Sequence, residues 1–277
     1  MNKYLRKPAN RMKLIRTLGS KFTDAELRSL SKGGGLALRS APTIKISHTG
    51  KTVSYGLITD THIGCVFYKP EYLSAAFKTF KKENVDFVIH CGDVTEGMSV
   101  RPGQVYELTQ VGYDAQKTYA IEQLSKWEGK MYLVDGNHDR WYLKANGALI
   151  VKDIARELPD AEFIGHDEGD IKIGNIWIKV FHGEDTSSYA TSYRIQKLVE
   201  SFTGGEKPNA LLVGHTHKQG YFFERNIHCV SGGAISTQSN WMRSKRMANH
   251  TGYHVIKMLV NDGGIIEFTV TFHPFYA

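Results

Sequence analysis

The sequence lacks any apolar run near the ~18–20 residues that a membrane-spanning helix requires. Its first seven residues are charged and lead into no apolar stretch, so we expect no secretory signal peptide and no membrane partner. Cysteine is scarce, with three residues that are odd in number and far apart: Cys65, Cys91 and Cys229. This pattern argues against a disulfide framework and predicts a reducing compartment, which we take to be the cytoplasm.

Most of the chain has a net charge close to zero, although the total formal charge is +7. Residues 1–45 carry eleven lysines or arginines and two acids, a net charge of +9, whereas the remainder carries −2. We therefore separate a basic N-terminal arm, residues 1–42, from a domain over 43–277. The arm is expected to hold short helices, one opened by the Thr-x-x-Glu capping box at 23–26 and stopped by the glycines at 33–35. Such an arm indicates attraction to a polyanion such as nucleic acid, with a solvated, solubilising tail as the alternative.

Residues 43–277 contain no internal repeats and no low-complexity tracts, and strands alternate with helices from about residue 44. Proline begins one expected helix at position 70, and Asn146 is the expected cap of another helix that Pro159 ends. The expected strands are 53–59, 85–91, 131–134, 171–173, 176–181, 210–213, 227–231, 254–260 and 265–272, and the expected helices are 70–82, 113–127, 146–158 and 193–202.

Short polar clusters follow five of the expected strands. In chain order they are Asp60-Thr61-His62, Gly92-Asp93, Gly136-Asn137-His138-Asp139, His182-Gly183 and Gly214-His215-Thr216-His217. Loops at the carboxyl ends of strands in an open α/β sheet converge on one crevice, so distant clusters can share a site. In D-x-H and H-x-H the two side chains are one residue apart, which places both on one face of an extended chain.

The residue types in these clusters match divalent metal ions. Imidazole suits zinc, iron, nickel or manganese, and carboxylate and amide oxygens suit harder ions such as manganese or magnesium. No cysteine stands in any cluster, which argues against a structural thiolate zinc site. One D-x-H or H-x-H alone is a weak signal, but five such clusters in order, each after a strand, predict a metal site.

With these motifs the sequence resembles the calcineurin-like metallophosphoesterase superfamily, whose signature is D-x-H, G-D, G-N-H-[D/E], H and G-H-x-H in that order. The resemblance covers roughly residues 53–233. It implies an α/β fold, namely a four-layer sandwich of two mixed β-sheets flanked by helices. It also implies hydrolysis of phosphoesters with two divalent metal ions, for which we expect manganese, with iron, zinc, nickel and magnesium as alternatives.

The resemblance further implies a role for each cluster residue. It assigns Asp60, His62, Asp93 and His217 to one metal and Asp93, Asn137, His182 and His215 to the other. It makes His138 the acid-base residue, with Asp139 as its orienting partner. Two ions ~3.5–4 Å apart clamp a phosphoryl group and activate a shared water, while an acid protonates the leaving oxygen. Arg140 is a candidate for holding a phosphate oxygen, with a structural arginine as the alternative.

The motifs also bear on the branch of the superfamily. Ser/Thr protein phosphatases carry Asp-Arg-Gly shortly after Gly-Asp and a Glu in the third motif, whereas this chain has Val-Thr-Glu-Gly at 94–97 and Asp139. This difference argues against a protein phosphatase. The chain is similar instead to phosphodiesterases and double-strand-break repair nucleases, and most of all to phage and prophage metallophosphoesterases labelled DNA-repair exonuclease-like. A phage-encoded protein would reside in the host cytoplasm.

Two features favour nucleic acid as the substrate. They are the basic arm and the segment 241–246. In this segment Trp241 stands among cations and can stack on a base. The alternative is an exposed loop that packs this Trp on the body. The leading hypothesis is a phosphodiesterase acting on nucleic acid or nucleotides, and the alternative is a small-molecule phosphoesterase for cyclic nucleotides or phosphorylated metabolites. A third hypothesis is a nucleic-acid-binding or assembly protein with structural metals, against which His138 speaks. The oligomeric state stays open.

Overall fold

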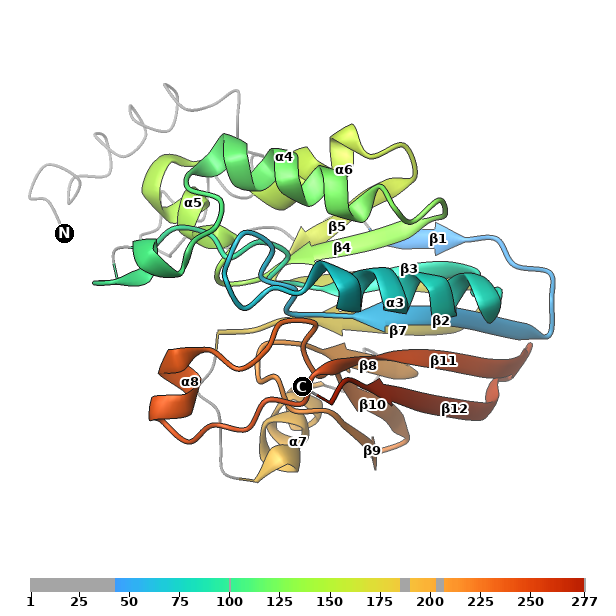
Figure 1. Ribbon diagram of the computed structural model, residues 1–277. Coiled ribbons are helices and arrows are strands. Elements are labelled where there is room, and N and C mark those ends of the chain that lie inside the picture. Colours follow the sequence, from blue (N-terminus) through green and yellow to red (C-terminus); the bar gives the residue numbers. More distant parts are fainter. Residues whose placement is uncertain (1–42, 100, 185–189, 203–206, 277) are drawn as a thin grey trace, which may run out of the picture. The chain divides into compact units, whose positions relative to one another are not determined.

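The computed structural model describes residues 43–99, 101–184, 190–202 and 207–276. The predicted basic arm at 1–42, with its short helices, lies outside these ranges and stays a prediction. Within the described ranges, every helix is too short or too polar to cross a bilayer. Figure 1 shows the strands and helices of this part of the chain with their labels.

Two mixed β-sheets of six strands each form the centre of the fold. One sheet has the order β1-β6-β7-β8-β10-β9 and the other has the order β12-β11-β2-β3-β4-β5. In the second sheet β2, β3, β4 and β5 are parallel, while β11 runs antiparallel to β2 and β12. The strands are β1 Ile44–Ile46, β2 Thr52–Ile58, β3 Phe87–Cys91, β4 Met131–Asp135, β5 Ala161–His166, β6 Glu168–Ile173, β7 Ile176–Phe181, β8 Ala210–Val213, β9 Gly220–Glu224, β10 Ile227–Ser231, β11 Gly252–Asn261 and β12 Gly264–Pro274.

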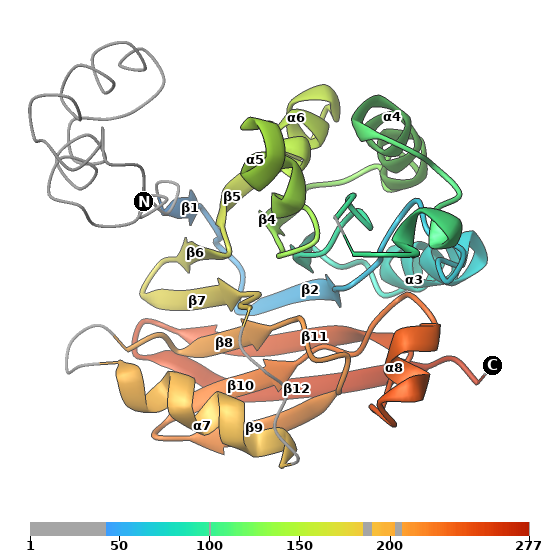
Figure 2. The same cartoon turned by 90° about the vertical axis from the view of Figure 1, so that its left-hand side faces the viewer.

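Helices cover the outer faces of both sheets. Figure 2 shows α3, α4 and α6 beside the sheet that contains β2, and α7 packs on β9 and β10 of the other sheet. The helices are α3 Pro70–Lys82, α4 Tyr113–Leu124, α5 Arg140–Asn146, α6 Ile150–Glu157, α7 Thr191–Ser201 and α8 Asn240–Ser244, with a 3-10 turn, η2, at Gln104–Glu107. The predicted four-layer sandwich is thereby confirmed.

Each interface between layers has its own hydrophobic cluster, and β2 shows how the sequence builds two of them. Val53, Tyr55 and Leu57 belong to the cluster between the sheets, whereas Ile58 belongs to the cluster under the helices. This alternation follows from the two-residue period of a strand. Gly56 faces Phe80 of α3, and an added Cβ there would lie 2.6 Å from the Phe80 ring. The glycine therefore lets a fully buried phenylalanine contact the strand.

The structure corrects the expected helix at 146–158. Asn146 does not cap it but ends α5, and Gly147 follows with a φ of 82° before α6 begins at Ile150. A glycine in the left-handed region is the usual residue after a helix end, and here it separates two short helices. Among the described elements, β1, β5, β9, α5, α8 and η2 have no counterpart in the expected set. β5 and β9 are edge strands with partly exposed side chains, so neither shows the apolar run of a buried strand.

Candidate metal centre

The predicted metal ligands follow strands of both sheets. β2, β3 and β4 of one sheet and β7 and β8 of the other lead directly into these ligands: Asp60, His62, Asp93, Asn137, His182, His215 and His217. Main-chain hydrogen bonds tie the loops together, as from Asp60 N to Gly92 O at 3.0 Å. The loops therefore converge at the ends of strands from both sheets of the sandwich.

Asp60, His62 and His217 form a first ligand group, in which one candidate ligand atom from each residue lies within 4.8 Å of the others. His217 Nε2 lies 3.2 Å from both Asp60 Oδ1 and His62 Nε2. Asp60 is fully buried, and its Oδ1 accepts no hydrogen bond within the described part of the chain. A cation would satisfy this oxygen and both imidazole nitrogens at once, so the group fits a metal ion.

Asp93, Asn137, His182 and His215 form a second ligand group beside the first. His182 Nε2 lies 3.2 Å from Asp93 Oδ2 and 3.1 Å from Asn137 Oδ1, and His215 Nδ1 lies 2.8 Å from the same amide oxygen. Asp93 Oδ2 is also 3.7 Å from His62 Nε2 of the first group. One carboxylate oxygen of Asp93 thus faces both groups, as a bridging ligand must.

Charge in the two groups is balanced between carboxylates and imidazoles. Burial alone would raise the pKa of Asp93, but the charges of His182 and His138 hold it well below its ordinary value. Burial alone would lower the pKa of His182, but Asp93 raises it to about 9. Burial and the charge of His182 lower the pKa of His215 to about 4. The buried carboxylates need nearby positive charge, which divalent ions supply when they displace imidazole protons.

Five of the seven predicted ligands share a strained backbone conformation. Ten non-glycine residues of the described chain have positive φ, and five of them are predicted ligands, with φ between 48° and 76°: Asp60, His62, Asp93, His215 and His217. This region of φ is costly for residues with a Cβ and persists only where the surrounding structure enforces it. Backbone strain is often concentrated at functional sites, so five strained residues in these loops indicate a functional site.

Two motif glycines make room for the ligands. A Cβ added at Gly136 would lie 2.1 Å from Asp93 Oδ1, and one at Gly92 would lie 2.5 Å from His182 Nδ1. Both distances are far below van der Waals contact. The glycines of G-D and G-N-H therefore stand where a ligand side chain crosses the backbone of a neighbouring loop.

Three ligand histidines bond through the ring nitrogen that faces away from their group. His62 Nδ1 lies 2.9 Å from Glu96 Oε2, His182 Nδ1 lies 2.6 Å from Cys91 O, and His217 Nδ1 lies 2.7 Å from Asn249 Oδ1. These contacts leave Nε2 of each ring toward the group and fix its tautomer and orientation. Sequence reasoning missed Glu96 and Asn249. Glu96 could have been found in the sequence, because it is an acidic residue only three positions after Asp93. No sequence signal indicated Asn249.

His138 lies beside both groups and contacts Glu96 rather than Asp139. Its Nδ1 is 2.9 Å from the main-chain oxygen of Glu96 and 3.5 Å from Glu96 Oε1. Its ring meets that of His62 edge-on at a centroid distance of 4.6 Å and lies 4.0 Å from that of Trp141. This geometry favours Glu96 as the orienting partner of His138.

Asp139 accepts hydrogen bonds from the main chain instead. Its carboxylate oxygens bond to the amides of Val94, Thr95 and Gly136 at 2.8–3.0 Å. These bonds tie the loop after β3 to the loop after β4. Asp139 therefore positions the backbone that carries ligands, which differs from the predicted contact with the His138 ring.

Arg140 is buried among carboxylates. Its side chain is 6% exposed, and its guanidinium lies 3.0 Å from Asp135, 3.0 Å from Asp167 and 2.8 Å from Glu184. It does not line the cavity over the ligand groups. These contacts favour the structural alternative over the predicted phosphate contact.

A cavity of about 660 Å³ opens over both ligand groups. Its volume lies within the ~300–1,000 Å³ usual for small-ligand sites. His62, Asp93, Asn137, His215 and His217 line it, together with His138. Around them stand aromatic and charged side chains, including Phe67, Trp141, Trp241, Arg101, Glu107, Glu184 and Lys245.

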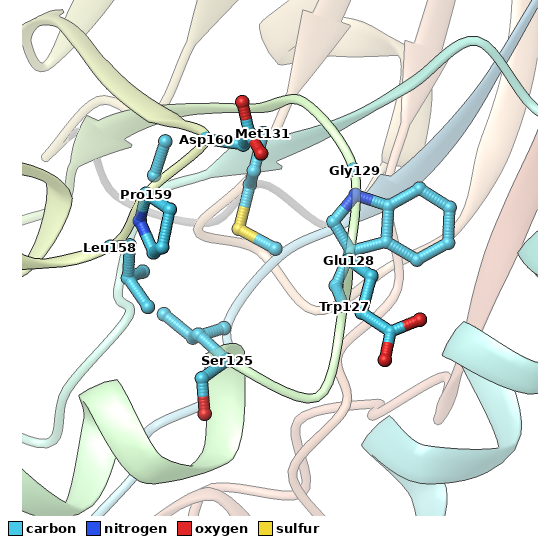
Figure 3. Close-up of a pocket in the computed structure, with 10 residues that line it drawn as sticks. Ser125, Trp127, Glu128, Gly129, Met131, Leu158, Pro159 and Asp160 are labelled. Atoms are coloured by element: carbon cyan, nitrogen blue, oxygen red, sulfur yellow. The ribbon is translucent and has the colours of Figure 1, made fainter.

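A second cavity, of about 250 Å³, lies at the opposite end of β4, where this strand and β5 begin. Figure 3 shows Trp127, Met131, Leu158 and Pro159 around it. The lining residues include two carboxylates, those of Glu128 and Asp160, but no histidine. This cavity therefore offers no comparable set of metal donors.

Curated proteins with similar sequences include two archaeal DNA polymerase II small subunits. That of Halobacterium salinarum is 24% identical over 246 residues, which cover 73% of this chain and 47% of that protein. That of Methanothermobacter thermautotrophicus is 20% identical over 240 residues, which cover 69% of this chain and 49% of that protein. The chain thus spans about half the length of these relatives.

Solved structures with a similar fold include an archaeal phosphodiesterase and Vacuolar Protein Sorting 29 from Cryptosporidium parvum. The first is 16% identical with a TM-score of 0.48 and covers 80% of this chain and 100% of its own. The second is 15% identical with a TM-score of 0.44 and covers 82% and 100%. The family profile of the calcineurin-like phosphoesterase superfamily domain matches residues 53–251, most of the chain and every predicted ligand. The chain belongs to the calcineurin-like phosphoesterase superfamily.

Proposed function

We propose that the protein is a two-metal phosphodiesterase that acts on nucleic acid or nucleotides. The observation that carries this proposal is the position of Asp93 Oδ2, 3.2 Å from His182 Nε2 and 3.7 Å from His62 Nε2, beneath a cavity that also holds His138. Two donor sets that share a carboxylate, with a spare imidazole beside them, match the needs of metal-assisted hydrolysis of a phosphoester.

The two ligand groups would each hold one divalent ion, with Asp93 shared. When bound, the ions supply positive charge to the phosphoryl oxygens and a hydroxide near neutral pH. Glu96 and Asn249 keep the rings of His62 and His217 turned toward their group. Asp139 keeps the loops after β3 and β4 at a constant distance, so that Asp93 can serve both groups.

His138 is proposed as the acid that protonates the leaving oxygen. Its Nδ1 faces the main-chain oxygen of Glu96, so its Nε2 is the nitrogen left for a substrate. It lines the cavity but belongs to neither ligand group. The substrate-binding role predicted for Arg140 is not carried into this proposal, because three carboxylates surround its guanidinium.

Nucleic acid is the favoured substrate for two reasons. Residues 1–45 carry a net charge of +9, which suits a phosphate backbone, and Trp241 of the predicted stacking segment lines the cavity. The names of the curated relatives, subunits of a DNA polymerase, agree with this direction. The resemblance to phage exonuclease-like proteins and the expectation of manganese stay predictions.

A small-molecule phosphoesterase is the second candidate, because a cavity of about 660 Å³ also suits a cyclic nucleotide or a phosphorylated metabolite. The third candidate is a non-enzymatic assembly protein whose metals are structural, and the polymerase-subunit names of the relatives keep it open.

An activity panel separates the three candidates. The purified protein is incubated with manganese, zinc, nickel, iron or magnesium and with bis(4-nitrophenyl) phosphate, 4-nitrophenyl phosphate, cyclic nucleotides, and single- and double-stranded DNA. We expect metal-dependent cleavage of diesters and of DNA. Asp93→Asn should lose this cleavage and should also lose at least one bound metal ion. Asp114→Asn, which changes an exposed carboxylate on α4, is the control and should retain both. Cleavage of cyclic nucleotides but not of DNA would favour the second candidate, and two bound metals without any hydrolysis would favour the third.

A further inference from the structure

The short helix α8 brings one face of the predicted stacking segment to the cavity over the ligand groups. Trp241 and Met242 of α8 line this cavity, as does Lys245 directly after it, whereas Arg243 and Ser244 do not. Lys245 is four positions after Trp241 and three after Met242, and residues three and four apart lie on one face of a helix, so the split follows from helical geometry. Figure 1 shows α8 at the same end of the sheets as α5, which follows the loop of Asn137 and His138.

The position of α8 is fixed relative to the metal ligands. The amide of Met242 donates to the side-chain oxygen of Ser239 at 3.2 Å, which caps the helix, and Met242 itself is buried. Beyond the helix, Asn249 bonds both to His217 Nδ1 and, through its side-chain NH₂, to Ser236 O. The segment that carries Trp241 is therefore anchored on a residue that contacts a ligand histidine.

The Trp241 side chain is exposed rather than packed in a hydrophobic cluster. It is 47% exposed and belongs to none of the three hydrophobic clusters of the described residues. The alternative that this Trp packs on the body is therefore not what the structure shows. A large aromatic ring held on a fixed support at a cavity wall is suited to stacking on another flat ring.

Lys245 adds a cation next to this ring. The other long cation of the cavity wall, Arg101, is paired with Glu107 at 2.5 Å. Lys245 forms no ion pair with any residue in the described ranges. The wall beside the ligand groups thus offers an aromatic face and a cation, the two elements of sites for single-stranded nucleic acid.

We propose that Trp241 and Lys245 form a nucleoside subsite that selects unpaired nucleotides. A base stacks on the Trp241 indole while its phosphodiester lies over the two ligand groups, and Lys245 contacts a neighbouring phosphate. Because the face of a base inside a duplex is covered by its neighbours, the subsite favours single strands and unpaired ends. This inference rests on the proposed phosphodiesterase function and names its substrate class.

Two substrates with the same leaving group test the subsite: thymidine 5′-(4-nitrophenyl phosphate) and ethyl 4-nitrophenyl phosphate, which lacks a base. We expect the wild-type protein to prefer the thymidine ester in kcat/KM. Trp241→Ala should reduce this preference by about 5- to 150-fold, mainly through KM, which corresponds to about 1–3 kcal/mol of stacking. Trp241→Phe should retain most of it. Hydrolysis of the ethyl ester should fall far less than that of the thymidine ester, and an unchanged thermal unfolding midpoint shows that the variant is folded.

Matched controls come from the same chain. Tyr276→Ala removes an aromatic side chain that is 91% exposed and does not line the cavity, so the preference should persist. The slope of log affinity for oligothymidylate against log salt is negative. Lys245→Ala should reduce its magnitude by about 0.7, the value for one neutralised phosphate of a single strand. Arg243→Ala, on the other side of the same helix turn, should change this slope by less.

The possible failures are distinguishable. If both esters are hydrolysed but Trp241→Ala keeps the preference, or if single strands and blunt duplexes are cut equally well, the subsite is overturned and the phosphodiesterase stands. If neither ester is hydrolysed with any metal, the proposed function fails. Binding of fluorescent oligothymidylate, measured by anisotropy, then decides the subsite: a loss of 5-fold or more in Trp241→Ala supports it, and no loss overturns it.

Discussion

Glu96 Oε2 lies 2.9 Å from Nδ1 of His62, while the main-chain oxygen of the same glutamate lies 2.9 Å from Nδ1 of His138. One residue thus orients a predicted metal ligand and the proposed acid. The carboxylate is buried and accepts a further hydrogen bond from Gln104 at 3.1 Å. Burial would raise the pKa of Glu96, but His138 and His62 lower it below its ordinary value, so the group is ionised.

Glu96→Gln should lower metal affinity or activity by about 10- to 100-fold, the usual effect of losing a carboxylate that orients a ligand histidine. The charge that favours the Nδ1-protonated tautomer of His62 is lost, while the shape of the side chain is kept. Metal titration by calorimetry and hydrolysis of bis(4-nitrophenyl) phosphate measure the effect. Glu107→Gln is the control, because Glu107 lines the same cavity but pairs with Arg101. Equal effects of both variants would contradict the orienting role.

His138→Asn should retain both metal ions, since His138 belongs to neither ligand group. Turnover of a substrate with a poor leaving group should fall by about 10²–10⁴-fold, as is typical when a general acid is lost. Nitrophenolate needs little protonation, so a nitrophenyl ester should be affected less. Rates on a dinucleotide and on its nitrophenyl analogue provide the comparison. Equal losses on both substrates would reject the acid role, and loss of metal would place His138 among the ligands.

Arg140→Ala should destabilise the fold rather than weaken substrate binding. Removing one partner of a buried ion pair costs about 3–5 kcal/mol of unfolding free energy, because the remaining charge is left uncompensated. Urea unfolding measures this loss, and the KM of the surviving folded enzyme should change little. Lys144→Ala is the matched control, because Lys144 pairs with the same Glu184 but is 55% exposed, and such pairs contribute about 0–1 kcal/mol. A raised KM with unchanged stability would instead restore Arg140 as a phosphate ligand.

Deletion of residues 1–42 should weaken binding to nucleic acid and leave hydrolysis of a small diester unchanged. It removes ten of the eleven basic residues of the first 45, while every predicted ligand lies beyond residue 59. The slope of log affinity against log salt should fall by about 0.7–0.9 for each phosphate that the shortened chain no longer neutralises. Binding that is independent of salt in the full chain would contradict the role of the arm. Loss of small-diester hydrolysis would show that these residues belong to the catalytic domain.

Much of the fold could be predicted because the local signals were strong. α3 begins at Pro70 and ends at Lys82, as expected for a helix with a proline in its first turn. β8 matches its expected bounds because a buried strand shows a continuous apolar run, and β10 matches its expected bounds as well. Asn146 misled the assignment of α5 and α6, since an asparagine suits a helix start as well as the position before a terminating glycine.

The family and the set of candidate ligands could be predicted from the amino-acid sequence. Metal donors come from few residue types, and D-x-H and H-x-H carry a spacing that is visible within a few positions. The tertiary structure alone decided that Glu96 rather than Asp139 meets His138, that Asn249 holds His217, and that Arg140 is enclosed by carboxylates. It also showed that Trp241 lines the cavity over the ligand groups. Most of these pairs join loops tens of residues apart, and such contacts depend on how strands are arranged within and between the two sheets, which leaves no periodic signal along the chain.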